Sequence, residues 1–75
     1  MGDVPGYQVY VGNLGDYCET RDLRDELSRF GELNKVARHP PGFAFVWFAH
    51  YRDARDAVRE LDGKSIAGRE WEVEL

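Results

Sequence analysis

Hydrophobic and polar positions follow two different periods along the chain, and these periods divide it into six elements. Three segments have the β-branched, aromatic or strictly alternating character of strands, and a fourth is a weaker strand of the same kind. Two others repeat apolar residues at helical spacing, and each is followed by Gly or Asp-Gly. In chain order we expect a strand at 8–14, a helix capped by Thr20 and ending before Gly31, strands at 33–38 and 43–48, a helix at 54–61 and a strand at 70–75. The pattern therefore predicts the order βαββαβ.

This order is a split βαβ arrangement of the α+β class. It predicts a ferredoxin-like sandwich, in which two helices pack on one face of a four-stranded antiparallel sheet. Residues two apart on a strand share a face, so the alternation also predicts which residues point at the helices. They are Val9, Val11, Ala44, Val46, Phe48, Trp71, Val73 and Leu75. The other face of the sheet is left uncovered.

The uncovered face should carry a concentration of aromatic side chains. They are Tyr10, Phe43, Phe45 and Trp47, accompanied by Gln8 and Gly12. A patch of this size on a small domain indicates a binding surface, because burying it would need a further sheet or helix that 75 residues do not supply. Flat aromatic rings suit unstacked bases, so single-stranded nucleic acid is the leading ligand.

Composition and charge qualify this prediction. The chain is 43% hydrophobic and 13% aromatic, which excludes a disordered segment, and its net charge is -4, which opposes polyanions. Most cations fall on the predicted helices or just before the second one: Arg21, Arg24, Arg29, Arg52, Arg55 and Arg59. Those left around the sheet are Lys35, Arg38, Lys64 and Arg69, with His39 a further candidate. We therefore expect a shallow salt dependence and an affinity of about micromolar or weaker.

The length of the chain allows one small domain, and its residues offer no metal site, catalytic set or membrane span. Residues 1–6 are expected to be a flexible tail and residues 7–75 a single domain. Cys18 has no Cys or His at metal-ligand spacing, and no nucleophile has a paired His and carboxylate, so we expect no metal, no cofactor and no enzyme. No apolar run reaches the roughly 18 residues of a membrane span. A single cysteine favours a reducing compartment inside the cell.

Two motifs on neighbouring predicted strands resemble the RNA-recognition motif (RRM) family. Residues 9–14, VYVGNL, match the family's hexamer, and residues 41–48, PGFAFVWF, match its octamer at every position except the first. The resemblance covers about residues 7–75. Segments 40–46, 52–54 and 56–63 are similar to the N-terminal RRM of serine/arginine-rich splicing factors.

The resemblance implies particular RNA contacts. In the family, two of the matched aromatic residues stack on bases and one packs against sugars; here they are Tyr10, Phe43 and Phe45. Further contacts are expected at the border of the sheet, from Gln8, Lys35 and Arg38. Asn13 is expected to organise the loop after the first strand. Trp47, where relatives usually have an acid, either extends the stacking surface or contacts a protein.

The sequence also departs from the family. Pro41 replaces a phosphate-binding cation and has neither a charge nor an N–H group. The second strand lacks the aromatic residue of similar domains. Three acids, Glu70, Glu72 and Glu74, should line the exposed face. They would oppose phosphate, accept from a base amino group such as cytosine N4, or form a solvated edge.

These features predict a single-stranded RNA-binding module of a pre-mRNA splicing or mRNA-processing factor. The resemblance implies a nuclear location, with shuttling to the cytoplasm left open. We expect a monomer whose partners are RNA and other splicing or messenger ribonucleoprotein components, without membrane attachment. The alternative is an RRM-like domain whose aromatic sheet face binds protein. Protein binding through an acidic first helix and an Arg-x-Phe loop is disfavoured, because residues 64–66 are Lys-Ser-Ile.

Overall fold

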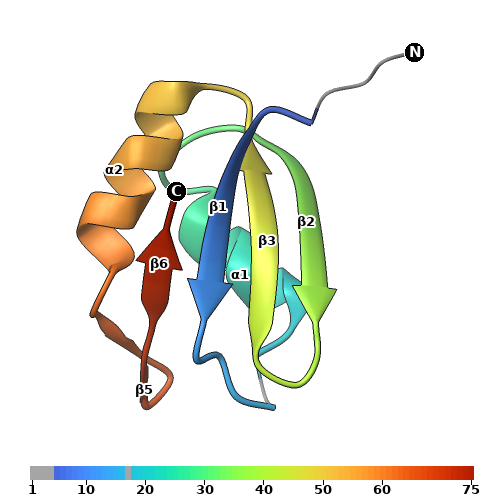
Figure 1. Ribbon diagram of the computed structural model, residues 1–75, viewed down its shortest axis with the longest axis vertical. Coiled ribbons are helices and arrows are strands. Elements are labelled where there is room, and N and C mark those ends of the chain that lie inside the picture. Colours follow the sequence, from blue (N-terminus) through green and yellow to red (C-terminus); the bar gives the residue numbers. More distant parts are fainter. Residues whose placement is uncertain (1–4, 17) are drawn as a thin grey trace.

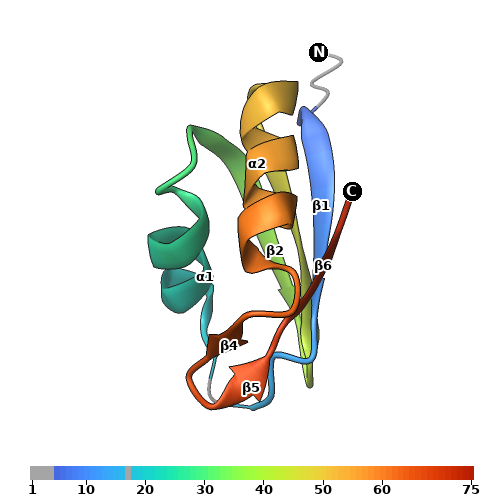
Figure 2. The same cartoon turned by 90° about the vertical axis from the view of Figure 1, so that its left-hand side faces the viewer.

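The computed structural model describes residues 5–16 and 18–75 and contains the predicted βαββαβ order with one additional hairpin. The main sheet is antiparallel, in the order β2-β3-β1-β6, and consists of β1 (Tyr7–Gly12), β2 (Leu33–His39), β3 (Phe43–Phe48) and β6 (Glu72–Glu74). The helices are α1 (Thr20–Leu27) and α2 (Tyr51–Leu61), and the hairpin is β4 (Ser65–Ile66) with β5 (Arg69–Glu70). Figures 1 and 2 show both helices on one side of the main sheet, which leaves the opposite face uncovered.

The N-terminal segment lies partly outside the described residues. Of the expected tail at 1–6, residues 1–4 are outside, whereas Pro5 and Gly6 precede β1. The Pro5 carbonyl accepts a hydrogen bond from the Asn34 side chain of β2. Pro5 therefore contacts the domain.

The core lies between the sheet and the helices, and the predicted alternation is confirmed for seven of the eight helix-facing residues. Val9, Val11, Ala44, Val46, Phe48, Trp71 and Val73 are all buried. Leu75 is the exception, because β6 ends at Glu74 and Leu75 is 59% exposed. The helices bury Leu23 and Leu27 of α1 and Ala54, Ala57 and Leu61 of α2 against this set. The apolar repeats at helical spacing thus form the buried face of each helix.

The bounds of α1 differ from the prediction at both ends. Glu19, not Thr20, is the N-cap residue, and its backbone N–H donates to Asp22 Oδ2 at 2.9 Å. A carboxylate in the first turn thereby satisfies a donor that the helix leaves unpaired. The helix ends at Leu27, and Phe30 packs against the core from the following turn.

The fourth predicted strand is divided into two parts. Residues 69 and 70 pair with β4 in the hairpin, while β6 pairs with β1 in the main sheet. Ala67 and Gly68 form the hairpin turn, and both have positive φ, 53° and 82°, as a tight two-residue hairpin requires. Trp71 joins the two parts, and its backbone N–H donates to the Lys64 carbonyl at 2.9 Å. The prediction of one continuous strand at 70–75 was therefore wrong.

Across residues 5–16 and 18–75, no helix is long and apolar enough to cross a membrane.

Candidate nucleic-acid interface

The uncovered face of the main sheet contains a continuous cluster of aromatic rings. Antiparallel pairing places Tyr10 of β1 opposite Phe45 of β3, with ring centroids 5.9 Å apart. Phe43 lies 6.0 Å from Tyr10 and 5.8 Å from Phe45, and Trp47 lies 6.1 Å from Phe45. These four side chains, all half-buried, are called the aromatic face below. Neighbouring pairs are in aromatic contact, yet the rings remain accessible.

The side chain of Tyr10 extends along β1 and covers Gly12. A Cβ atom at Gly12 would come within 2.3 Å of the Tyr10 hydroxyl and 2.8 Å of its ring. Gly12 is consequently buried rather than facing water, which corrects the prediction for that residue. The glycine after the Val-Tyr-Val run thus lets the Tyr10 ring lie flat on the sheet.

Lys35 and Gln8 lie beside Trp47 from the two neighbouring strands. Trp47 pairs with Gln8 of β1 and with Lys35 of β2. The Lys35 ammonium lies 5.2 Å from the centroid of the Trp47 ring, which is a cation–π distance. Both border residues are exposed, so their polar groups can reach a ligand on the aromatic face.

His39 also belongs to this surface, one residue beyond the strand predicted at 33–38. It lies opposite Phe43, and the two rings stack at 5.2 Å with an interplanar angle of 13°. The His39 ring also meets the Phe45 ring edge-on at 5.7 Å. Extending the alternation of β2 from Lys35 through Ala37 to position 39 would have placed His39 on this face.

Arg38 points away from the aromatic face, because its partner in the register is the buried Ala44. Its guanidinium has five N–H donors. They bond to backbone carbonyls in two loops and on β2 and β3, at distances of 2.7 to 3.1 Å. The acceptors are the carbonyls of Gly15, Cys18, His39, Pro41 and Phe43. These bonds favour a structural role for Arg38, and its contact with RNA stays a prediction.

Two of the three predicted acids lie on the sheet face that carries the aromatic rings. Glu74 pairs with Tyr10, and Glu72 pairs with Gly12, so the carboxylates of β6 border the Tyr10 ring. Glu70 instead pairs with Ser65 in the hairpin, outside the main sheet, so its predicted position was wrong. The aromatic face therefore has Lys35 at one side and two carboxylates at the other.

Asn13 and Arg69 connect the loop after β1 to the hairpin. The Asn13 side-chain amide donates to the Glu70 carbonyl at 2.8 Å, and the Arg69 guanidinium donates to the Asn13 backbone and side-chain oxygens at 3.1 and 2.8 Å. Asn13 has positive φ, 61°, which asparagine tolerates better than most residues. This geometry fits the loop-organising role expected of Asn13.

The chemistry available on this face is stacking, cation–π contact and hydrogen bonding. Within the described part of the chain, no group of three or more His, Cys, Asp or Glu side chains could hold a metal ion. Shallow stacking surfaces with few cations suit unpaired bases better than a duplex, whose bases are already stacked.

An open four-stranded sheet with a central aromatic cluster, backed by two helices, defines a class of single-stranded nucleic-acid-binding domain. The RNA recognition motif family model matches residues 9–72. The chain belongs to this family.

Proteins of similar sequence show which members of the family this domain resembles. Serine/arginine-rich splicing factor 3 of Homo sapiens is 51% identical over 70 residues, which cover 91% of this chain and 43% of the relative. RNA-binding protein Rsf1 of Drosophila melanogaster is 47% identical over 77 residues, which cover all of this chain and 39% of that protein. The chain thus spans less than half the length of these relatives. The similarity to serine/arginine-rich splicing factors expected from the motifs is confirmed.

Solved structures agree with the fold. The crystal structure of RNA Binding Protein PG1 superposes with a TM-score of 0.84 at 29% sequence identity, covering 92% of each chain.

Proposed function

We propose that this domain binds single-stranded RNA through the aromatic face, as the RNA-binding module of a pre-mRNA splicing or mRNA-processing factor. The observation that carries the proposal is the contact of Tyr10, Phe43 and Phe45 in one cluster on the uncovered side of the sheet. The similarity to serine/arginine-rich splicing factors supports the process. The same similarity supports a nuclear location, and shuttling to the cytoplasm and a monomeric state belong to this proposal.

Stacking supplies most of the binding free energy in this proposal. Each base stacked on an aromatic side chain contributes about 1–3 kcal/mol. Two of the rings of Tyr10, Phe43 and Phe45 offer their faces to bases, while the third packs against the sugars. His39 already stacks on Phe43, so a nucleotide at this position either continues the stack or displaces the imidazole.

Polar and charged groups at the border orient the strand. Lys35 beside Trp47 meets a phosphate, and Gln8 offers hydrogen bonds to a base edge. Glu72 and Glu74 oppose phosphates on the other border. With so few cations facing the RNA, binding is weak and its salt slope shallow.

A titration of the 15N-labelled domain with short single-stranded RNA tests this proposal. We expect the largest amide shifts at residues 10, 43 and 45, and a loss of affinity of about 1–3 kcal/mol on Tyr10→Ala. Tyr51→Ala is the control, because Tyr51 is an exposed tyrosine that lies on α2, away from the aromatic face. Unmoved amides on the aromatic face at high RNA excess, or equal losses in the two variants, would rule the proposal out.

A further inference from the structure

A hollow of about 500 Å3 lies at one end of the aromatic face. Tyr10 and Phe43 of that face line it together with Arg69 of β5. The remaining lining residues belong to the β1–α1 loop and to the turn between β2 and β3. Trp47 lies at the other end of the aromatic face, because it pairs with Gln8 near the start of β1. The hollow, called the loop-end hollow below, therefore extends the aromatic face past the end of β1.

Hydrogen bonds hold the two loops around the loop-end hollow together. The Leu14 N–H donates to the Gly42 carbonyl at 2.9 Å, which joins the β1–α1 loop to the β2–β3 turn. The Arg38 guanidinium bonds to the same two segments, since it donates to the carbonyls of Gly15 at 2.7 Å and Pro41 at 3.1 Å. Contacts within the domain therefore fix the shape of the hollow.

The Arg69 guanidinium is held in place at the loop-end hollow. Its Nε and Nη2 groups donate to the backbone and side-chain oxygens of Asn13 at 3.1 and 2.8 Å. Its stem crosses Gly15, because a Cβ atom at Gly15 would come within 2.6 Å of Arg69 Cδ. Within residues 5–16 and 18–75 the guanidinium makes no further hydrogen bond, so two of its five N–H donors are used and the other three remain for a ligand.

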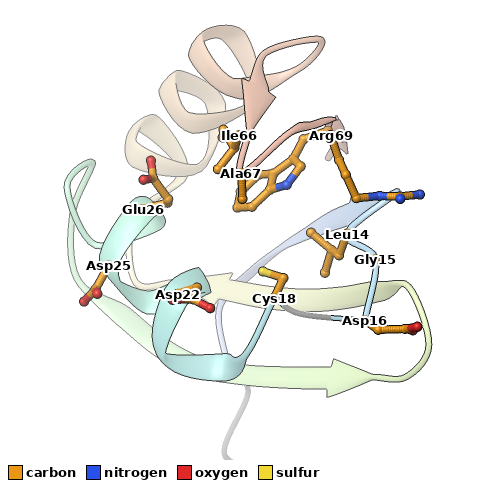
Figure 3. A pocket seen from close by; sticks show the side chains of 11 residues that line it. Leu14, Gly15, Asp16, Cys18, Asp22, Asp25, Glu26, Ile66, Ala67 and Arg69 are labelled. Atoms are coloured by element: carbon orange, nitrogen blue, oxygen red, sulfur yellow. The ribbon is translucent and has the colours of Figure 1, made fainter.

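Arg69 also points away from the nearest acidic elements. Figure 3 looks into a neighbouring hollow on the helix side and shows the Arg69 guanidinium at the edge farthest from the acidic side chains of α1. Glu70, the next residue of β5, points the other way, because a Cβ atom at Gly63 would lie 3.8 Å from Glu70 Oε2. Arg69 forms no ion pair with any residue that the structure describes. Its positive charge is therefore available to a ligand.

Arg69 is the only lysine or arginine among the described residues that line the loop-end hollow. Pro41 lines it from the β2–β3 turn and has neither a charge nor an N–H group. Asp16 lines it as well, and its carboxylate opposes an anion. An anionic ligand with a flat ring would therefore place its charge on the Arg69 guanidinium and its ring toward Tyr10 or Phe43.

We propose that Arg69 binds a phosphate of the RNA strand where the strand leaves the aromatic face, which makes the loop-end hollow an additional nucleotide subsite. This proposal rests on RNA binding at the aromatic face. A planar guanidinium pairs with two phosphate oxygens through parallel hydrogen bonds. Because Asn13 already orients Arg69, less side-chain freedom is lost on binding than for an unrestrained arginine.

The subsite and Lys35 then hold the RNA at opposite ends of the aromatic face. Lys35 lies over Trp47, opposite Gln8 of β1, whereas Arg69 is bound just beyond Gly12. Gln8 and Gly12 are four residues apart, which is about 13 Å at about 3.3 Å per residue. The two cations therefore contact different phosphates of one strand.

The salt dependence of RNA binding tests whether Arg69 contacts a phosphate. Arg69→Gln removes the charge, and Arg59→Gln is the matched control, because Arg59 is an exposed arginine on α2. Fluorescence anisotropy of a labelled short single-stranded RNA measures the affinities over a range of salt concentrations. We expect Arg69→Gln to weaken binding about threefold to tenfold and to reduce the slope of log K against log salt by about 0.7. Arg59→Gln should change the affinity less than about twofold and leave the slope unchanged.

Arg69→Lys separates the charge from the hydrogen bonds to Asn13. Lysine keeps the positive charge but cannot reproduce the geometry of the two bonds to Asn13. We expect it to retain the wild-type salt slope and to lose less affinity than Arg69→Gln. Asp16→Asn should instead strengthen binding, because it removes the carboxylate that opposes the phosphate.

An RNA in which one phosphate at a time is replaced by an uncharged methylphosphonate locates the contact. All versions carry 2′-O-methyl groups, which keep the modified linkage intact. The replacement that weakens wild-type binding through Arg69 should have no further effect on Arg69→Gln, since the interaction is already lost. Lys35→Gln should be insensitive to a different replacement, at the other end of the strand.

Equal weakening by Arg69→Gln and Arg59→Gln would overturn the proposal, because binding would then follow net charge alone. Weakening by Arg69→Gln with an unchanged salt slope would also overturn it, since Arg69 would then act only by holding Asn13. If Tyr10→Ala weakens binding and Arg69→Gln does not, the Arg69 subsite is refuted while RNA binding at the aromatic face stands. Unmoved amides on the aromatic face at high RNA excess would refute both.

Discussion

Replacing Glu72 by lysine tests how charge on β6 limits RNA binding. Glu72 lies opposite Gly12, and the Tyr10 ring covers Gly12, so the carboxylate borders the outer end of that ring. Neighbouring strands lie about 4.8 Å apart. We take a phosphate attached to a nucleotide stacked on Tyr10 to lie about one and a half strand spacings, on the order of 7 Å, from the side-chain charge at position 72.

The expected gain follows from Coulomb's law and screening. In bulk water two unit charges at about 7 Å interact with about 0.6 kcal/mol, and changing the charge from -1 to +1 doubles the effect to about 1.2 kcal/mol. Screening leaves about 0.5 kcal/mol at about 0.15 M salt and about 0.9 kcal/mol at about 0.01 M. Glu72→Lys should thus strengthen RNA binding about twofold at the higher salt and about fivefold at the lower salt.

Fluorescence anisotropy of a labelled short single-stranded RNA measures both affinities. Glu70→Lys is the control, because it makes the same charge change on an exposed residue of the hairpin, outside the main sheet. Equal gains in the two variants would refute a local effect on the aromatic face. Weaker binding of Glu72→Lys would instead show that the carboxylate accepts a hydrogen bond from a base.

Three further predictions concern single residues. Gly12→Ala should lift the Tyr10 ring and cost about 1–3 kcal/mol of RNA affinity, while urea denaturation shows a change in unfolding free energy below about 1 kcal/mol; unchanged affinity would contradict this arrangement. Arg38→Lys should lower the unfolding free energy by about 1.5–3 kcal/mol, because an ammonium cannot replace the bonds to five carbonyls; an unchanged urea midpoint would refute this. For Cys18, the raised pKa lowers the thiolate fraction at a given pH, so the rate of alkylation by iodoacetamide should rise at higher pH in the folded domain than in the urea-unfolded chain. Coincident pH profiles would contradict the effect of burial and Asp22.

The sheet could be predicted from the sequence because alternation is a local signal. Val9 and Val11 around Tyr10 already assign one residue to the aromatic face and two to the core. The hairpin was missed because a turn with positive φ at Ala67 has only Gly68 as a sequence signal, and the alternation around Trp71 resembles a continuous strand.

Some features of the candidate site depend on long-range geometry that the sequence does not show. The sequence predicts that Arg38 borders the RNA, and that contact stays a prediction, but its five carbonyl acceptors come from separate parts of the chain. The hydrophobic pattern of the sequence gives no indication of such a hydrogen-bond network. The predicted strand ends at residue 38, one residue short of β2, which extends to His39 and places its ring on Phe43.

The guanidinium of Arg38 joins two loops to the strand that carries Phe43. Its acceptors include the carbonyls of Gly15 and Cys18 in the β1–α1 loop, Pro41 in the β2–β3 loop and Phe43 of the aromatic face. A movement of either loop that breaks one of these bonds leaves a guanidinium N–H without its acceptor. Arg38 thus fixes one end of the aromatic face from behind, although its own side chain points away from that face.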